Sequence, residues 1–174
     1  MMEKTVWLFG LSGAGKTTLA VSLLKEMEGQ RNVILLDGDR LRRGINSNLG
    51  FSKEDRRENV RRIAEVCKLL MQVGVMPIVA AITPYQNDRR LIESIIGRKK
   101  ISWIYVKCSL QVCELRDPKG LYVLARKGVV PSFTGVSDSF EPPILNGMLV
   151  IDSESEEPVE SVKKIFEMLQ SSIV

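Results

Sequence analysis

Apolar positions along this chain form short continuous runs that alternate with longer stretches at helical spacing. The runs at 6–9 and 33–36 end at a glycine and an aspartate, which predicts two buried strands. The stretch at 16–27 between them repeats apolar residues every three or four positions, as one face of a helix does. The same patterns predict further strands over 76–82, 101–106 and 148–151, and further helices over 53–73, 88–96, 110–116, 121–127 and 159–169.

The alternation of strands and helices predicts an α/β fold. Strands that alternate with helices form parallel βαβ units, whose sheet is covered by helices on both faces. The nearly continuous apolar strands agree with such burial, and Asp88 is a candidate N-cap for the helix at 88–96. No linker divides the chain, so we expect a single domain over 1–174 with a three-layer α/β/α architecture and a mostly parallel sheet.

Polar loops directly follow three of the predicted strands. These loops are 10–17, 37–39 and 83–85. In open parallel sheets, ligands bind beyond the carboxyl ends of the strands. We therefore expect the three loops to meet at one crevice.

The first of these loops is glycine-rich and has the P-loop pattern Gly10-Leu-Ser-Gly-Ala-Gly-Lys-Thr17. Glycines let successive backbone N–H groups point at phosphate oxygens, and the helix N-terminus that follows favours anions. Lys16 is expected to reach the β- and γ-phosphates of ATP, and Thr17 to offer its hydroxyl to Mg²⁺. The residues predicted to bind the nucleotide are Gly10, Ser12, Gly13, Ala14, Gly15, Lys16, Thr17 and Thr18.

Two carboxylates, Asp37 and Asp39, follow the second predicted strand. One of them can help to hold Mg²⁺ or its water, and the other can accept a proton from an attacking hydroxyl. The alternative is a turn with capping aspartates, a common use of Asp-Gly. Asp39 is the preferred base because it lies further from the strand, and Lys16 and Asp37 complete the predicted catalytic set.

The charge of the chain is basic but is not arranged as a nucleic-acid surface. The formal net charge is +4 and the pI is near 9.0. Basic residues cluster at 40–43, 56–62 and 116–127, with few aromatic residues among them. This pattern favours pockets for phosphate or sulfate over nucleic acid. Arg61 and Arg62 also fit a solvated helix face.

Cysteine and histidine usage excludes several kinds of site. The three cysteines, Cys67, Cys108 and Cys113, form no Cys-x-x-Cys pair, and we expect all three to be buried apolar residues. Since the chain has no histidine, a general base must be Asp, Glu or Lys. No targeting segment and no apolar stretch of about 20 residues is visible, so we expect a cytoplasmic protein without a membrane partner.

Motifs spread over almost the whole chain resemble the adenylylsulfate kinase (APS kinase) family, whose fold is of the P-loop NTPase type. The segments that carry the resemblance are 10–18, 36–39 with Arg42, 49–52 with 55–62, Pro84-Tyr85, 116–122 and 133–135. The resemblance implies transfer of the γ-phosphate of ATP to the 3′-hydroxyl of adenylylsulfate, which gives PAPS and ADP in sulfate assimilation. It also implies a homodimer.

The resemblance also implies roles for individual residues. Phe51 and Phe133 would sandwich the adenine of adenylylsulfate, and the lid would lie at about 116–135. Thr83 stands where the family typically has serine, and we expect it to bind substrate. The residues implied to bind the acceptor are Arg42, Phe51, Arg56, Asn59, Ile82, Thr83, Lys119, Gly120, Leu121 and Phe133, and Arg116 is implied to bind ATP.

Two alternatives remain open at the level of sequence. Another small-molecule P-loop kinase, acting on a sugar acid, a nucleoside or a shikimate-like acceptor, would have the same phosphate site. The pair of Phe51 and Phe133 argues against a sugar acid, which offers no flat π-face for stacking. A non-enzymatic nucleotide switch is the other alternative, although Lys16, Thr17, Asp37 and Asp39 are all present.

Overall fold

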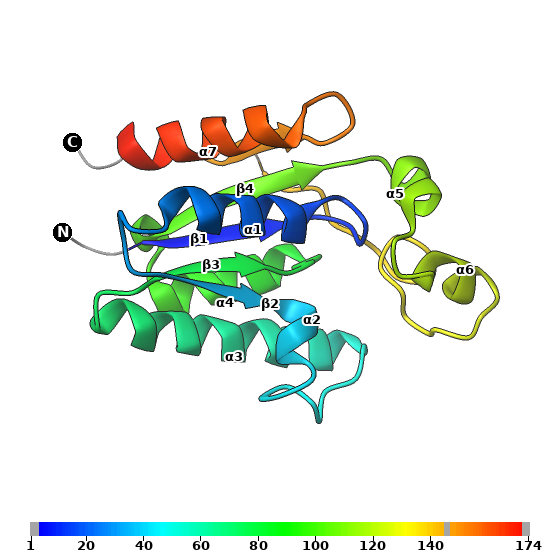
Figure 1. Ribbon diagram of the computed structural model, residues 1–174. Coiled ribbons are helices and arrows are strands. Elements are labelled where there is room, and N and C mark those ends of the chain that lie inside the picture. Colours follow the sequence, from blue (N-terminus) through cyan, green and yellow to red (C-terminus); the bar gives the residue numbers. More distant parts are fainter. Residues whose placement is uncertain (1–3, 145–146, 172–174) are drawn as a thin grey trace.

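A sheet of five parallel strands lies at the centre of the computed structural model, which describes residues 4–144 and 147–171 (Figure 1). The strands are β1 (Thr5–Phe9), β2 (Val33–Asp37), β3 (Met76–Ala80), β4 (Ile101–Lys107) and β5 (Leu149–Asp152). Their order in the sheet is β2-β3-β1-β4-β5, and every pairing is parallel. The predicted α/β fold is therefore confirmed.

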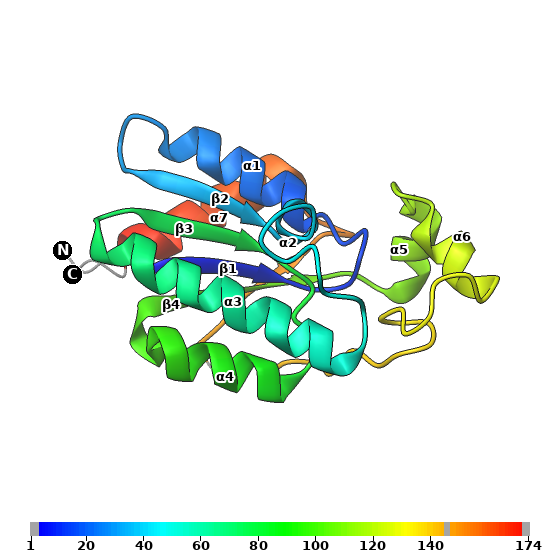
Figure 2. The ribbon, with the colours of Figure 1, turned by 90° about the horizontal axis from the view of Figure 1, so that it is seen from below.

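Helices cover both faces of the sheet (Figures 1 and 2). One face packs on α1 (Lys16–Met27) and α7 (Pro158–Ser171), and the other packs on α3 (Lys53–Gln72) and α4 (Gln86–Ile96). Alternate residues of β1 serve the two layers, because side chains of a strand point to opposite faces. Leu8 packs with α1 and α7, and Trp7 packs with α3 and α4.

Short helices lie at and beyond the carboxyl ends of the strands. These helices are α2 (Gly38–Leu41), α5 (Leu110–Arg116) and α6 (Leu121–Arg126), and α5 and α6 stand apart from the sheet (Figure 1). A 3₁₀ turn, Arg98–Lys100, precedes β4. The predicted helices and strands match the structure to within about two residues at each end, which is the usual uncertainty of helix boundaries.

Three features of the fold differ from the sequence-based expectations. Strand β2 is an edge strand rather than a buried one, and Ile34 is 39% exposed. Helix α4 begins after Tyr85, and Asp88 is a buried residue in its first turn rather than its cap. Helix α2 occupies part of the expected polar loop 37–39, with Asp37 as its N-cap. No helix within 4–144 and 147–171 is long and apolar enough to cross a bilayer.

Candidate functional site

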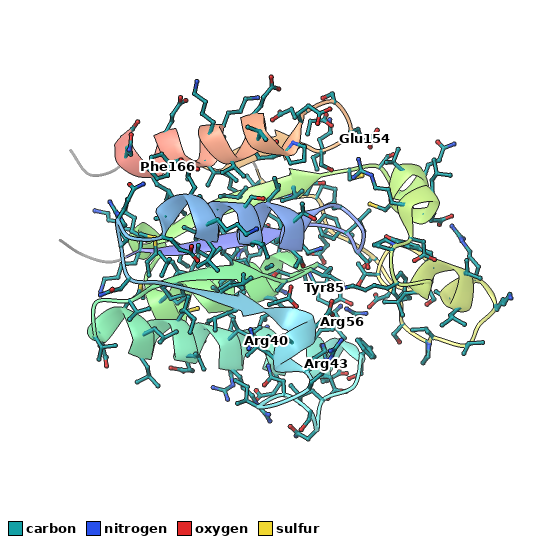
Figure 3. The ribbon with its side chains drawn as sticks, in the orientation of Figure 1. Arg40, Arg43, Arg56, Tyr85, Glu154 and Phe166 are labelled. Carbon is teal, nitrogen blue, oxygen red and sulfur yellow. The ribbon has the colours of Figure 1, made fainter. Side chains whose placement is uncertain are left out.

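A cleft of about 1120 Å³ opens beyond the carboxyl ends of the strands. The three polar loops predicted to converge do so there, since residues of 10–17, 37–39 and 83–85 all contribute to its walls. Every predicted site residue except Gly10, Ala14 and Gly120 lines the cleft. In Figure 3, Arg40, Arg43, Arg56 and Tyr85 lie at this end of the sheet, beside α2.

The glycine loop packs closely on β4 on one side, and on the other it presents the N-terminus of α1 to the cleft. A Cβ atom at Gly10 would lie 2.3 Å from the carbonyl oxygen of Val106, so only glycine fits there. Ala14 is fully buried, and both residues shape the loop from behind the cleft. Gly15 adopts a left-handed conformation as the N-cap of α1 and provides no side-chain cap, which leaves the helix N-terminus open to a ligand.

Lys16 is the buried cation of the phosphate site. Its Nζ donates a hydrogen bond to the carbonyl oxygen of Leu11 at 2.7 Å. Burial lowers the pKa of Lys16 to about 8, and the carboxylate of Asp39 opposes part of that shift. The ammonium group is therefore held without a direct ion pair, in a place where a phosphate would compensate its charge.

The two aspartates have different environments. Oδ2 of Asp37 accepts a hydrogen bond from the Thr17 hydroxyl at 2.7 Å, while Oδ1 accepts from the backbone N–H groups of Asp39 and Arg40. Asp37 is thus the N-cap of α2, which matches the capping alternative, and it also fixes Thr17. Asp39 is exposed on the cleft, where its carboxylate forms an ion pair with Lys119.

The far side of the cleft presents an aromatic ring with two arginines. Phe51 is 48% exposed, and the guanidinium groups of Arg42 and Arg56 lie 4.7 and 5.7 Å from the centre of its ring. Phe133 differs from Phe51, because it is buried and packs edge to face on Tyr122 with ring centres 4.9 Å apart. Phe51 therefore leaves part of its ring accessible in the cleft, whereas Phe133 is part of the core where it borders the cleft. The adenine sandwich remains a prediction.

Backbone carbonyl groups accept hydrogen bonds from both Arg42 and Arg56 and so fix their positions. Nη1 of Arg42 donates to the carbonyl oxygens of Leu49 and Gly50, at 3.2 and 2.7 Å. Burial lowers the pKa of Arg42 and of Arg56. Asn59, one turn beyond Arg56 on α3, accepts a hydrogen bond from the Nδ2 of Asn46 at 3.0 Å. The side chains on this side of the cleft are thus held in place by hydrogen bonds within the protein.

The loop after β3 faces both the cleft and the core. Thr83 is 99% buried, and its hydroxyl accepts a hydrogen bond from the indole Nε1 of Trp7 at 2.9 Å. Its backbone has a positive φ of 46°, an uncommon conformation for a threonine. The carbonyl oxygen of Ile82 accepts from the Gly10 N–H at 3.3 Å, which ties this loop to the glycine loop.

The predicted lid, 116–135, contacts the rest of the molecule at several points around the cleft. Lys119 reaches Asp39, and the Tyr122 hydroxyl donates to the carbonyl oxygen of Ser12 at 2.9 Å. Gly120 lies outside the cleft and begins α6 with a positive φ of 65°. Arg116 donates to the carbonyl oxygen of Ser153 at 2.6 Å.

Sequence reasoning missed one wall of the cleft and two buried polar residues. The wall is the segment 153–158, which directly follows β5. The rule that placed the other loops at the cleft also applies to this one, but the strand before it is only four residues long and the loop carries none of the motifs. Asn46 and Arg89 are both fully buried, and no pattern distinguishes them from solvated polar residues of a loop and a helix.

The cysteines have the environment that was predicted for them. Cys67, Cys108 and Cys113 are free and buried. Burial raises the pKa of Cys67 and of Cys113 to about 12. The described part of the chain contains no group of three or more Cys, Asp or Glu side chains that could hold a metal ion by themselves.

Comparisons with known proteins show the family to which this chain belongs. The family model described as adenylylsulphate kinase matches residues 2–152. An adenylyl-sulfate kinase of Oceanobacillus iheyensis is 47% identical over 166 residues, covering 95% of this chain and 83% of the relative. One of Pseudomonas aeruginosa is 47% identical over 168 residues, covering 96% and 85%. The structure of the Mycobacterium tuberculosis APS kinase in complex with AMPPNP and APS superimposes with a TM-score of 0.90 at 36% identity, covering 97% of this chain and 98% of that one.

Proposed function

This chain belongs to the adenylylsulphate kinase family, and from that premise we propose that it transfers the γ-phosphoryl group of ATP to the 3′-hydroxyl of adenylylsulfate. The products are ADP and 3′-phosphoadenylylsulfate. One observation in the structure carries the proposal beyond family membership. A single cleft holds a phosphate site on one side and, on the other, a half-exposed aromatic ring with two arginines close to it.

ATP binds with its phosphates against the glycine loop. The open N-terminus of α1 and the ammonium group of Lys16 supply positive charge there. Arg116 and the segment 153–158 border the same side of the cleft and are proposed to hold the rest of the nucleotide. When phosphate binds, Lys16 can exchange its hydrogen bond with Leu11 for a charged partner.

The acceptor binds on the opposite side, with its adenine on Phe51. A flat purine gains stacking energy on an aromatic face, and a planar guanidinium suits oxyanions such as phosphosulfate better than an ammonium does. Arg42, Arg56 and Asn59 are the proposed ligands of the phosphosulfate and ribose. Ile82, Thr83, Leu121 and Phe133 complete this side of the cleft. Gly120 stays a proposed acceptor residue only through its backbone, since it lies outside the walls.

Phosphoryl transfer depends mainly on alignment and on neutralising charge. Asp39 stands at the cleft between the two sides and is the proposed acceptor of the proton from the 3′-hydroxyl. Lys119, which pairs with Asp39 in this structure, is placed to neutralise charge on the transferred group once substrates separate the pair. Asp37 acts through Thr17 and through the cap of α2, rather than as a base.

Thr17 and Asp37 fit a role in holding Mg²⁺. The hydroxyl and the carboxylate are adjacent, and Mg²⁺ is usually bound by one or two such oxygen atoms together with water and substrate phosphates. A Mg²⁺ ion held by these two residues would supply neutralisation of the negative charge that develops on the phosphates.

Assembly and location are further parts of the proposal. We propose a homodimer in the cytoplasm that binds neither nucleic acid nor membranes. Size-exclusion chromatography with light scattering measures the oligomeric state, and a monomer would contradict the proposed homodimer. Cell fractionation measures the second.

The direct test of the function is ADP release by the purified chain. We expect ADP formation with ATP, Mg²⁺ and adenylylsulfate, and none above the ATP-only control with gluconate, shikimate or a nucleoside. Absence of ADP formation with adenylylsulfate would contradict the proposal. Faster turnover of a sugar acid would favour a different small-molecule kinase.

A further inference from the structure

Arg56 connects the two turns that carry Phe51 and Phe133. Its Nε donates to the carbonyl oxygen of Phe51 at 3.0 Å, and its Nη2 donates to the carbonyl oxygen of Ser132 at 2.7 Å. Ser132 immediately precedes Phe133, so one side chain joins segments that are far apart in sequence. Because Arg56 is 94% buried, it has little freedom to move without moving both turns.

Asp138 and Tyr85 hold the other side of Arg56. Oδ2 of Asp138 lies 4.0 Å from the Nε of Arg56 and also accepts a hydrogen bond from the Tyr85 hydroxyl. Tyr85 is 97% buried at the start of α4. Burial raises the pKa of Tyr85 and the carboxylate of Asp138 adds to that effect, so the hydroxyl keeps its proton and remains a donor at neutral pH.

Asp138 belongs to the same tight turn as Phe133. Its N–H donates to the carbonyl oxygen of Phe133 at 3.0 Å, and its own carbonyl oxygen accepts from the Gly135 N–H at 2.7 Å. The residue whose carboxylate faces Arg56 is therefore hydrogen-bonded through its backbone to Phe133. Neither Tyr85 nor Asp138 lines the cleft, so neither is placed to touch a ligand.

We propose that Tyr85 and Asp138 are positioning residues of the acceptor site. They hold Arg56, and through it the turns of Phe51 and Phe133, at the spacing that admits the purine of the acceptor nucleotide. A buried guanidinium bonded only to neutral carbonyls needs a compensating charge, and Asp138 supplies it. Sites whose first ligands are locked by such neighbours lose less free energy to ordering when substrate binds. This inference rests on the proposed function, because it assumes that the acceptor is a nucleotide.

Three variants isolate the contact: Tyr85→Phe, Asp138→Asn and the double variant. Each single variant is expected to raise KM for adenylylsulfate about tenfold, the size of effect usual when a hydrogen bond to a charged group is lost. KM for ATP and kcat should stay within about twofold of wild type, because the phosphate site does not depend on the contact. The double variant should be no worse than the worse single one, because both residues act through the same contact.

Asp88→Asn is the matched control. Asp88 is a buried aspartate that pairs with Arg57, the residue after Arg56, at 3.3 Å, and it lies outside the cleft. Its substitution should leave KM for adenylylsulfate unchanged. An unchanged KM for adenylylsulfate in both single variants would overturn the inference. Equal rises in both KM values together with a lower melting temperature would also overturn it, as a merely structural role. If the wild-type chain itself fails to turn over adenylylsulfate, the proposed function fails first.

Discussion

Lys16 shows how a single residue can be prepared for an anionic ligand. It is 91% buried, its only described hydrogen-bond acceptor is a neutral carbonyl group, and its pKa is lowered to about 8. The desolvation that lowers this pKa also strengthens its interaction with a phosphate, since charges interact more strongly away from water. The buried charge of Lys16 lowers the stability of the free protein, but it strengthens the binding of a phosphate.

The lowered pKa of Lys16 predicts a pH dependence for ATP capture. The charged form dominates below pH 8 and is lost as the pH rises through that value. We therefore expect kcat/KM for ATP, which reports on the free enzyme, to fall above about pH 8. A Lys16→Arg variant should lack this step, because arginine stays protonated. A wild-type profile that is flat to pH 10 would contradict the prediction.

Phe51 predicts a selective loss of acceptor binding. Phe51→Ala removes an exposed aromatic face, and stacking on such a face contributes about 1 kcal/mol beyond burial of area. We expect KM for adenylylsulfate to rise about tenfold, with KM for ATP unchanged. Ile45→Ala is the control, because Ile45 is similarly exposed at 53% but lies outside the cleft. Equal effects of the two substitutions would argue against stacking.

The sequence allowed the residues of the candidate site to be predicted more fully than the environments of their side chains. The sequence located Lys16 and Thr17 because their chemistry requires a fixed spacing after the glycine loop. It could not show that Phe133 is buried against Tyr122, or that the Thr83 hydroxyl faces Trp7. Those orientations depend on contacts between segments far apart in the chain, which no local pattern records.

At the scale of elements, the glycine loop that connects β1 to α1 packs directly on the backbone of β4. Gly10 packs so closely on the backbone of Val106 that a Cβ atom would overlap its carbonyl oxygen. The nearest atoms belong to backbone and cannot rotate away. The loop and the end of β4 are therefore fitted to each other.

This close approach predicts a large loss of stability for Gly10→Ala. We expect the free energy of unfolding, measured by urea denaturation, to fall by more than about 3 kcal/mol, since steric overlap adds to backbone strain. Gly29→Ala is the control, because Gly29 has a positive φ of 76° but no atom within 4 Å of the added Cβ. It should cost only about 1 kcal/mol. Similar losses in the two variants would contradict the packing argument.

The elements themselves were largely predictable, and the exceptions have physical causes. Continuous apolar runs located all five strands, because a parallel sheet is buried on both faces. Strand β2 has the same pattern although it lies at the edge, so its exposure could not be inferred from composition. Helix α2 escaped prediction since it spans only four residues and depends on its cap, Asp37.

At the scale of the whole molecule, the predicted lid, 116–135, contacts two of the segments that line the cleft. Lys119 and Tyr122 come from the lid and reach residues of two different loops, Asp39 and Ser12. The predicted lid therefore connects the glycine loop with the segment 37–39. These two segments are thus linked by contacts with the predicted lid as well as through the sheet.

Removal of the lid lysine should affect catalysis more than folding. For Lys119→Ala we expect kcat to fall about a hundredfold, which is typical when a group that stabilises transition-state charge is lost. The melting temperature should change little, because the ion pair with Asp39 is half exposed and such pairs contribute little to stability. Lys127→Ala, also in the lid but outside the cleft, should retain wild-type kcat. Equal activity of both variants would contradict the assigned role.

The most direct test of the account is the acceptor atom of the reaction. The chain should phosphorylate adenylylsulfate with one ADP released per product, and mass spectrometry with ³¹P NMR should place the new phosphate on the 3′-oxygen. The 3′-deoxy analogue of adenylylsulfate should bind, and compete with adenylylsulfate, but yield no ADP above the ATP-only control. ADP formation at an equal rate with the 3′-deoxy analogue, or a phosphate found at any other position, would contradict the account.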